Sequence, residues 1–299
     1  AKDLGVGLHI KSGDSGADVN AIADELVVEG SAHSGITIAS GNSSTGTIAF
    51  ADSGDTLVGR IVYDHANDDL SIGVGGVADR ILIASNGSTT ISTPDNADTL
   101  TLTSTDADAL VGPNLNFYRN SSSPADGDLM GQIKFTGESA GSGIHTYGSI
   151  VMENNGVTDG QEQGKIKFNI SMPDGALANV FDVGRAEITI NEDSEDLDFR
   201  VESNGNTHAL FVEGSSGAVG IGENGGNSPL GNLHVKSGDS GVGSANSARQ
   251  ELVLEGSGNS GMTILSGTSS VGGVGFGDSD GNLQGLMQYN HATDNFEFN

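Results

Sequence analysis

The chain has 299 residues and carries 12 Lys and Arg against 40 Asp and Glu, a formal net charge of −28 at pH 7. So few cations exclude nucleic-acid binding, which depends on neutralising phosphates. The absence of Cys excludes disulfides, thiolate metal sites and a cysteine nucleophile. No apolar run approaches the roughly 18 residues of a membrane span, so we expect no membrane insertion.

A duplicated module dominates the organisation of the chain. Residues 8–16 recur at 233–241 with one change, and residues 25–72 match residues 251–298 at 24 of 48 positions. Repeats of this kind are supersecondary units that bury little alone and are stabilised by their neighbours. We therefore place a first fibre-repeat module at 1–92, one or more β-rich shaft modules at 93–232, and a second repeat module, truncated at its C-terminus, at 233–299.

Apolar residues in the repeats come in couples two positions apart, which is the strand period, so each couple predicts a short strand with one apolar face. We expect these residues to pack in a core or between chains, and they are Leu26, Val28, Ile36, Ile38, Ile48, Phe50, Ile61, Tyr63, Leu252, Leu254, Met262, Ile264, Val274, Phe276, Met287 and Tyr289. Glycines between the couples predict turns, because glycine allows positive φ. These turn glycines are Gly30, Gly35, Gly41, Gly46, Gly256, Gly261, Gly267 and Gly272.

Alternating apolar residues continue through the middle of the chain and predict strands at 99–103, 132–135, 165–170, 187–190 and 198–201, while only 18–25 allows a helical turn. Strands with so few large apolar side chains cannot close a monomeric core, and their edges would be exposed. The expected fold class is therefore all-β, as an elongated intertwined homo-oligomeric fibre of short strands, and the residues alone leave two or three chains open. The sequence does not choose among a triple β-helix, a β-prism and a chain of small β-sandwich beads.

Several runs resemble the shaft repeats of bacteriophage tail fibres, especially those of marine phages, which often precede an endosialidase-type intramolecular chaperone. They include Glu-Leu-Val-Val-Glu-Gly at 25–30 and Gly-Arg-Ile-Val-Tyr-Asp-His at 59–65. The resemblance implies an extracellular homotrimer in the virion that contacts other tail proteins. A tip outside this chain would bind the host receptor. The expected function is a structural shaft that supports host attachment. The alternatives are an adhesin segment that binds glycans or cell surfaces and a polysaccharide depolymerase.

Motifs that could carry chemistry favour structural interpretations, and we assign no catalytic, cofactor-binding or metal-binding residue. Gly220–Gly225 matches GxGxxG, but the Gly, Asn and Pro that follow cannot begin the helix of a dinucleotide site. His9 and His234 share one repeat position, where threefold symmetry could gather a metal site, although we favour hydrogen bonding. The loop at Asp278 lacks the Gly and Glu of an EF-hand. Calcium or another ion bound by turn carboxylates is the alternative to no cofactor.

Overall fold

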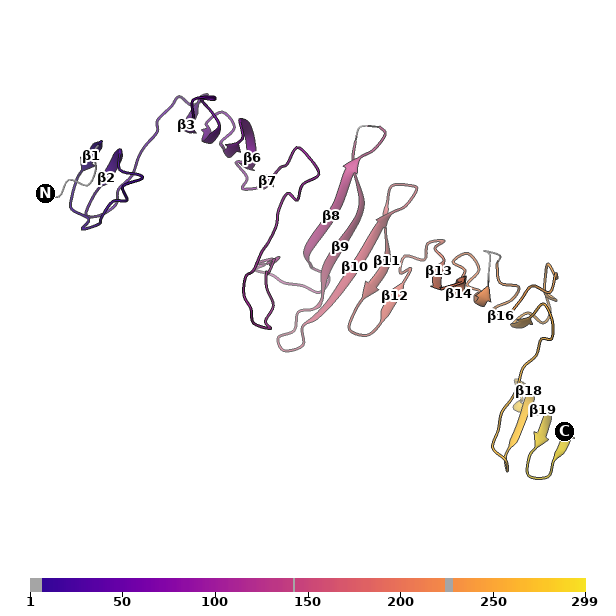
Figure 1. The fold of residues 1–299 in the computed structure, drawn as a ribbon. Helices are drawn as coiled ribbons and strands as arrows, with labels where there is room; N and C mark the ends of the chain where they lie inside the picture. Colours follow the sequence, from indigo (N-terminus) through magenta and orange to yellow (C-terminus); the bar gives the residue numbers. More distant parts are fainter. Residues whose placement is uncertain (1–6, 142, 224–227) are drawn as a thin grey trace. The chain divides into compact units, whose positions relative to one another are not determined.

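The computed structural model describes residues 7–141, 143–223 and 228–299, and these residues form strands and turns without any helix (Figure 1). The strands make several small open sheets, so the predicted all-β class is confirmed. The chain divides into two units, Ala1–Leu115 and Asn116–Asn299. Residues 18–25, where a helical turn was allowed, contain a turn closed by a 3.0 Å bond from the Ala23 N–H to the Asn20 carbonyl.

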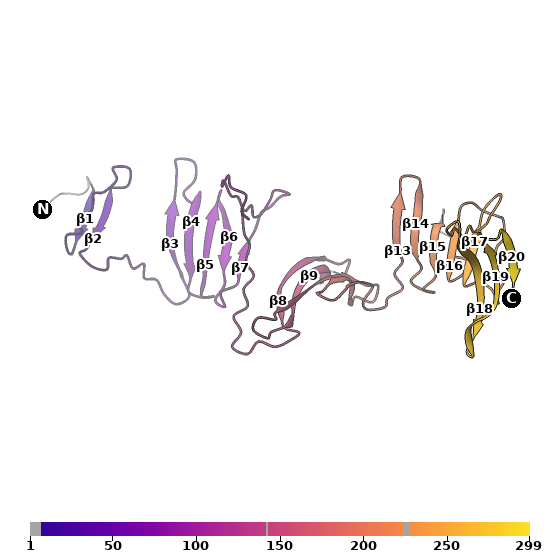
Figure 2. The same cartoon turned by 90° about the horizontal axis from the view of Figure 1, so that it is seen from below.

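The first unit contains a two-stranded parallel sheet and a five-stranded antiparallel sheet. The parallel pair is β1 (Leu8–Lys11) and β2 (Leu26–Glu29), with Leu8 opposite Leu26 and Ile10 opposite Val28. The antiparallel strands lie side by side in chain order (Figure 2) and are β3 (Thr45–Phe50), β4 (Gly59–Asp64), β5 (Asp69–Val74), β6 (Val77–Ile83) and β7 (Thr89–Ile91). Gly75 and Gly76 both have positive φ, which suits the tight turn between β5 and β6.

The second unit begins with another five-stranded antiparallel sheet in chain order. Its strands are β8 (Leu129–Glu138), β9 (Ile144–Gly156), β10 (Gln163–Ser171), β11 (Leu177–Val183) and β12 (Ile188–Ile190). The strands predicted at 132–135 and 165–170 lie inside the longer β8 and β10, and the strand predicted at 187–190 matches β12 within a residue. The alternating run at 99–103 pairs with no strand, because alternation shows that a segment suits one apolar face but supplies no partner.

A mixed sheet follows, made of β13 (Phe199–Ser203), β14 (Asn206–Val212), β15 (Val219–Glu223), β16 (Leu233–Lys236) and β17 (Leu252–Glu255). β14 is antiparallel to both of its neighbours, β13 and β15, whereas β15, β16 and β17 are parallel. The predicted module boundary at 232 falls inside this sheet, because β15 before the boundary pairs with β16 after it. The boundary at 92 falls just after β7, whereas the two units divide between residues 115 and 116.

The last sheet has three antiparallel strands, β18 (Val271–Asp278), β19 (Gly281–Asn290) and β20 (Asn295–Phe298). It repeats β3, β4 and β5 in register. Val274 lies opposite Met287 and Met287 opposite Phe298, just as Ile48 lies opposite Ile61 and Ile61 opposite Ile72. The duplicated sequence therefore encodes a duplicated sheet.

Two groups of predicted positions differ from expectation. Ile36, Ile38, Met262 and Ile264 lie outside the strands. None of the eight predicted turn glycines has positive φ, and Gly46 and Gly272 lie inside β3 and β18. These two glycines make room for packing, since a Cβ on Gly46 would lie 3.4 Å from Ile38 Cγ2 and a Cβ on Gly272 would lie 3.2 Å from Ile264 Cγ2.

Candidate functional site

One face of the β3–β7 sheet is crossed by an unbroken row of isoleucines. Ile48, Ile61, Ile72, Ile81 and Ile91 stand opposite one another in successive strands. Directly opposed residues of antiparallel strands project from the same face. The five side chains therefore form one apolar row across the whole sheet.

The same arrangement recurs in every sheet of three or more strands in the described part of the chain. In the β8–β12 sheet the row is Ile133, Ile150, Phe168, Phe181 and Ile190. In the mixed sheet it is Val201, Leu210, Ile221, Val235 and Leu254, and in the last sheet it is Val274, Met287 and Phe298. We call these four sets of residues, one on a face of each sheet, the apolar rows. Their recurrence in sheets of different sequence indicates a common packing role.

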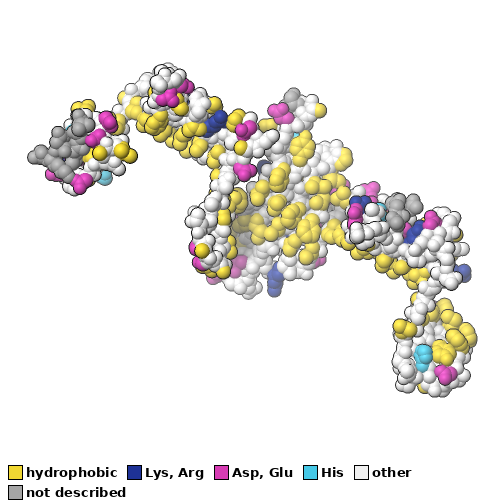
Figure 3. Space-filling model, in the orientation of Figure 1, with side chains coloured by type: hydrophobic (Ala, Val, Ile, Leu, Met, Phe, Trp, Pro, Cys, Tyr) yellow, Lys and Arg dark blue, Asp and Glu magenta, His cyan; other side chains and the backbone are white. Residues whose placement is uncertain are grey.

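These faces are largely uncovered within the single chain. Ile48 is 48% exposed, Ile61 and Ile72 are each 37% exposed, and Phe298 is 74% exposed. Figure 3 shows apolar side chains gathered over the visible face of the β8–β12 sheet. Buried apolar residues are few among the described residues, namely Val27, Val151, Ala178 and Phe211. The chain thus leaves its apolar side chains without an intrachain core.

The sixteen residues predicted to pack are therefore not buried in the single chain. Val28, Val274 and Tyr289 are half-buried and the other thirteen are exposed. In β2 and β17, Leu26, Val28, Leu252 and Leu254 occupy the uncovered face, while Val27 and Glu29 point to the buried side. Packing between chains stays a prediction for all of them.

A buried glutamate cluster lies on the opposite face of the β1–β2 pair. Glu29 is 5% exposed, and its Oε1 accepts hydrogen bonds from the Ser15 backbone N–H at 2.7 Å and from Ser15 Oγ at 3.1 Å. Lys11 Nζ reaches the same oxygen at 3.2 Å, and His9 Nε2 lies 2.9 Å from Oε2. The loop after β1 is thereby fastened over the end of β2.

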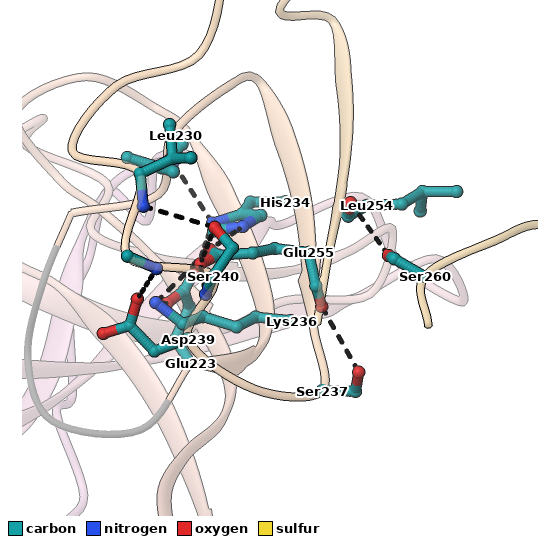
Figure 4. Close-up of polar contacts among 12 residues, drawn as sticks. Glu223, Leu230, His234, Lys236, Ser237, Asp239, Ser240, Leu254, Glu255 and Ser260 are labelled. Atoms are coloured by element: carbon teal, nitrogen blue, oxygen red, sulfur yellow. Dashed lines mark hydrogen bonds and ion pairs between the residues drawn. The ribbon is translucent and has the colours of Figure 1, made fainter. Parts of the chain in front are cut away.

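The second repeat rebuilds this cluster around Glu255 (Figure 4). Its Oε1 accepts bonds from the Ser240 N–H at 2.7 Å and from Ser240 Oγ at 2.9 Å. Its Oε2 lies 3.3 Å from Lys236 Nζ and 3.0 Å from His234 Nε2. The second cluster gains a carboxylate from β15, because Glu223 Oε1 contacts His234 Nδ1, to which the Leu230 N–H also donates at 3.2 Å.

The two clusters account for polar identities that apolar periodicity leaves unexplained. Both copies keep the Lys, the Ser and the Glu that bond to one another, although strand alternation alone would place the Lys and the Glu in solvent. Gly13 and Gly238 are also kept, since a Cβ there would lie 2.5 and 2.6 Å from the Oγ atoms of Ser31 and Ser257. The identity of charged residues between the copies was the signal that could have predicted these clusters.

The electrostatics of both glutamates favour the ionised form. The Ser15 backbone N–H, opposed by burial and helped by Lys11, Ser15 Oγ and His9, lowers the pKa of Glu29 to about 2. Burial raises the pKa of Glu255, but the N–H and Oγ of Ser240 together with Lys236 bring it down to about 2. The same contact with Glu29 raises the pKa of Lys11. Each cluster is therefore held by a carboxylate rather than a carboxylic acid.

Acid should loosen both clusters. An unfolded glutamate has a pKa of about 4.3, above the folded values near 2, so its folded pairing stabilises the chain fully above pH ~4.3. We expect that stabilisation to be lost as the pH falls from about 4.3 through about 2. Circular dichroism of the β-sheets against pH measures the loss. In the Glu29→Gln, Glu255→Gln double variant, the β-sheet signal should fall less steeply as the pH drops below about 4.3. The same pH dependence in the double variant and the unchanged chain would contradict the assignment.

The other candidate positions have local structural contacts. His65 and His291 stack edge-on against Tyr63 and Tyr289, with ring centroids 5.0 and 4.9 Å apart. Asp278 Oδ1 accepts the backbone N–H groups of Asp280 at 2.9 Å and Gly281 at 3.2 Å, which closes its own turn. Of the GxGxxG match, Gly220–Glu223 belong to β15, while Asn224 and Gly225 lie outside the described residues.

Neither a metal-ligand cluster nor a membrane-spanning helix is found among residues 7–141, 143–223 and 228–299. Those residues contain no group of three or more His, Cys, Asp or Glu side chains placed to hold a metal ion. They also contain no helix with the length and hydropathy of a membrane span.

Comparisons with protein-family models, with curated proteins and with solved structures found no match for the chain.

Proposed function

We propose that this chain is a structural segment of a homotrimeric fibre, in which copies of the chain cover one another's apolar rows. The observation that carries the proposal is the unbroken apolar row on one face of each of four sheets. A row that crosses all strands of a sheet is a core face, and a core face needs a second layer. The described chain supplies no such layer, since most row residues stay exposed or half-buried.

The energies favour burial of these faces by association. Full burial of one isoleucine or leucine side chain contributes roughly 1.5–3 kcal/mol, so covering the exposed part of each row residue is worth about 1 kcal/mol. Four rows together offer enough apolar surface to exceed the entropy lost on association. An exposed apolar surface on this scale otherwise causes aggregation.

Further copies of the same chain are the partners that fit best. Identical chains aligned along one axis bring each row against its own counterpart, and closed symmetry then leaves no apolar face open. The net charge of −28 opposes random contacts between the outer polar faces. Three copies is the number that the resemblance to phage tail-fibre shafts implies.

The biological role that we propose follows from that resemblance. The trimer acts as an extracellular shaft in the virion, joining other tail proteins to a host-binding tip outside this chain, and supports host attachment mechanically. We assign it no catalytic role. Bending or opening one sheet would require breaking contacts with the other two copies.

Binding to a glycan array and to host cells separates a shaft from an adhesin. We expect the purified, assembled chain to show no saturable binding to the glycan array or to host cells, because a shaft connects other proteins and does not itself bind a receptor. Saturable binding by the assembled chain would overturn the shaft role in favour of an adhesin, whereas release of reducing sugar from host polysaccharide would indicate a depolymerase.

A further inference from the structure

The cluster around His234 differs from its counterpart around His9 in one chemically important respect. His234 is fully buried, and a carboxylate faces each of its ring nitrogens, Glu223 at Nδ1 and Glu255 at Nε2. His9 pairs with one glutamate, Glu29, in the described residues, and its side chain is 14% exposed. The second repeat has therefore buried one extra acidic group in an otherwise matching site.

The extra carboxyl group, Glu223, leaves the second cluster with one negative charge that no cation among the described residues compensates. Glu255 and Lys236 neutralise each other, as do Glu29 and Lys11 in the first repeat. Glu223 then adds one negative charge at a position that is 2% exposed. A buried charge without compensation costs several kcal/mol, so the folded site favours one additional proton.

The contact between Glu223 and His234 is the place for that proton. Because the Leu230 N–H donates to Nδ1, that nitrogen keeps its lone pair, so the extra proton belongs on the Glu223 carboxyl group and the pair is neutral overall. Burial, opposed by the nearby cations, raises the pKa of Glu223, which agrees with this count. The further acid of the first repeat is Asp14, which lies 3.6 Å from Lys11 Nζ and is exposed, so its charge stays in water and this cluster needs no extra proton.

We propose that the Glu223–His234 pair is a proton-dependent latch that keeps β15, β16 and β17 together and that loosens when the extra proton on Glu223 leaves. The groups that face the pair come from all neighbouring strands: His208 from β14, Lys236 from β16 and Glu255 from β17. On the covering loop, Asp239 accepts the Gly241 N–H and is exposed. All of these residues belong to one chain, so the latch does not depend on the proposed trimer.

The sign of the pH dependence follows from proton counting. A solvent-exposed Glu ionises near pH 4.3 and a solvent-exposed imidazolium loses its proton near pH 6.5, so the pair in an opened sheet holds no extra proton above pH ~7. The closed pair holds one proton, and its stability therefore decreases as the pH rises. The opening equilibrium should increase up to about tenfold per pH unit until the closed pair itself loses the proton.

Hydrogen exchange of the full chain between pH 6.5 and 9.5, corrected for intrinsic exchange rates, tests the latch. Amides of β15–β17 should open up to about tenfold more per pH unit, whereas amides of β1 and β2 should show no such rise. Glu223→Gln should abolish the rise, because glutamine is neutral at every pH. The control Glu202→Gln changes an exposed carboxyl group paired with Arg200 and should leave the rise intact.

Two results would overturn the latch. One is opening of β15–β17 that does not vary with pH in the unchanged chain, and the other is a rise that persists in Glu223→Gln. If that variant does not fold, carbon NMR of the Glu223 carboxyl and the His234 ring in the unchanged chain replaces it. The pair should retain one proton at pH 8, and a pair that is fully deprotonated at pH 7 in an intact sheet would refute the proposal.

Discussion

Ile48→Asp is expected to break the assembly into single chains, whereas Thr47→Asp at the neighbouring position is expected to leave it intact. The two residues are adjacent in β3 and both are exposed in the single chain, but they point to opposite faces of the sheet. Ile48 begins the isoleucine row, so its replacement places a carboxylate in every copy of the proposed interface. An unpaired carboxylate in a buried interface costs several kcal/mol.

Light scattering measures the mass of each variant, and circular dichroism measures its β-sheet content. Ile48→Asp should keep the β-sheet spectrum, because its side chain contributes little to the fold of the single chain, while the measured mass falls toward 30.2 kDa. Thr47→Asp should keep both the spectrum and the mass. Equal masses for the two variants would show that the apolar row does not form the interface.

Glu255→Ala is expected to release β16 from β17 almost completely. The substitution removes the acceptor of the Ser240 N–H and Oγ and leaves Lys236 and His234 without their shared carboxylate. Breaking one side of a buried ion pair typically costs 3–5 kcal/mol, or a loss of roughly 150- to 5,000-fold in the protection of local amides. Hydrogen exchange of the β16–β17 amides measures this loss directly.

A matched control for this variant lies in the same sequence run. Glu251 is an exposed glutamate four residues before Glu255, and Glu251→Ala should change protection by less than about 0.5 kcal/mol. Glu29→Ala should loosen β1 and β2 in the same way, with a smaller effect because His9 is partly exposed. If Glu251→Ala and Glu255→Ala lost protection equally, the buried cluster would have no special role.

The all-β class and most of the strands could be predicted because alternation is a local property of the sequence. Ile61 and Tyr63 are two positions apart, and this spacing alone places both side chains on one face of a strand. The same logic failed at 99–103, and at Ile36 and Ile38, where the period was right but no partner strand was present. Pairing depends on residues distant in sequence, which alternation cannot identify.

The glutamate clusters were missed for a different physical reason. Glu29 lies at the end of an apolar strand, where a charged residue normally marks exposure. Its burial depends on a serine from a loop 14 residues earlier and on a parallel strand partner. Comparison of the two repeats held the missing information, since Lys, Ser and Glu are unchanged while the apolar residues vary in volume. Close packing rather than positive φ explains Gly46 and Gly272, whereas a Cβ on Gly35 or Gly261 would meet open space.

The mass of the folded chain in solution tests the central claim most directly. For a homotrimer we expect three times the 30.2 kDa of one chain, about 91 kDa, by light scattering at neutral pH, with the apolar rows protected from solvent. A folded β-sheet species at 30.2 kDa would contradict that claim, because the four rows would then face water without a partner.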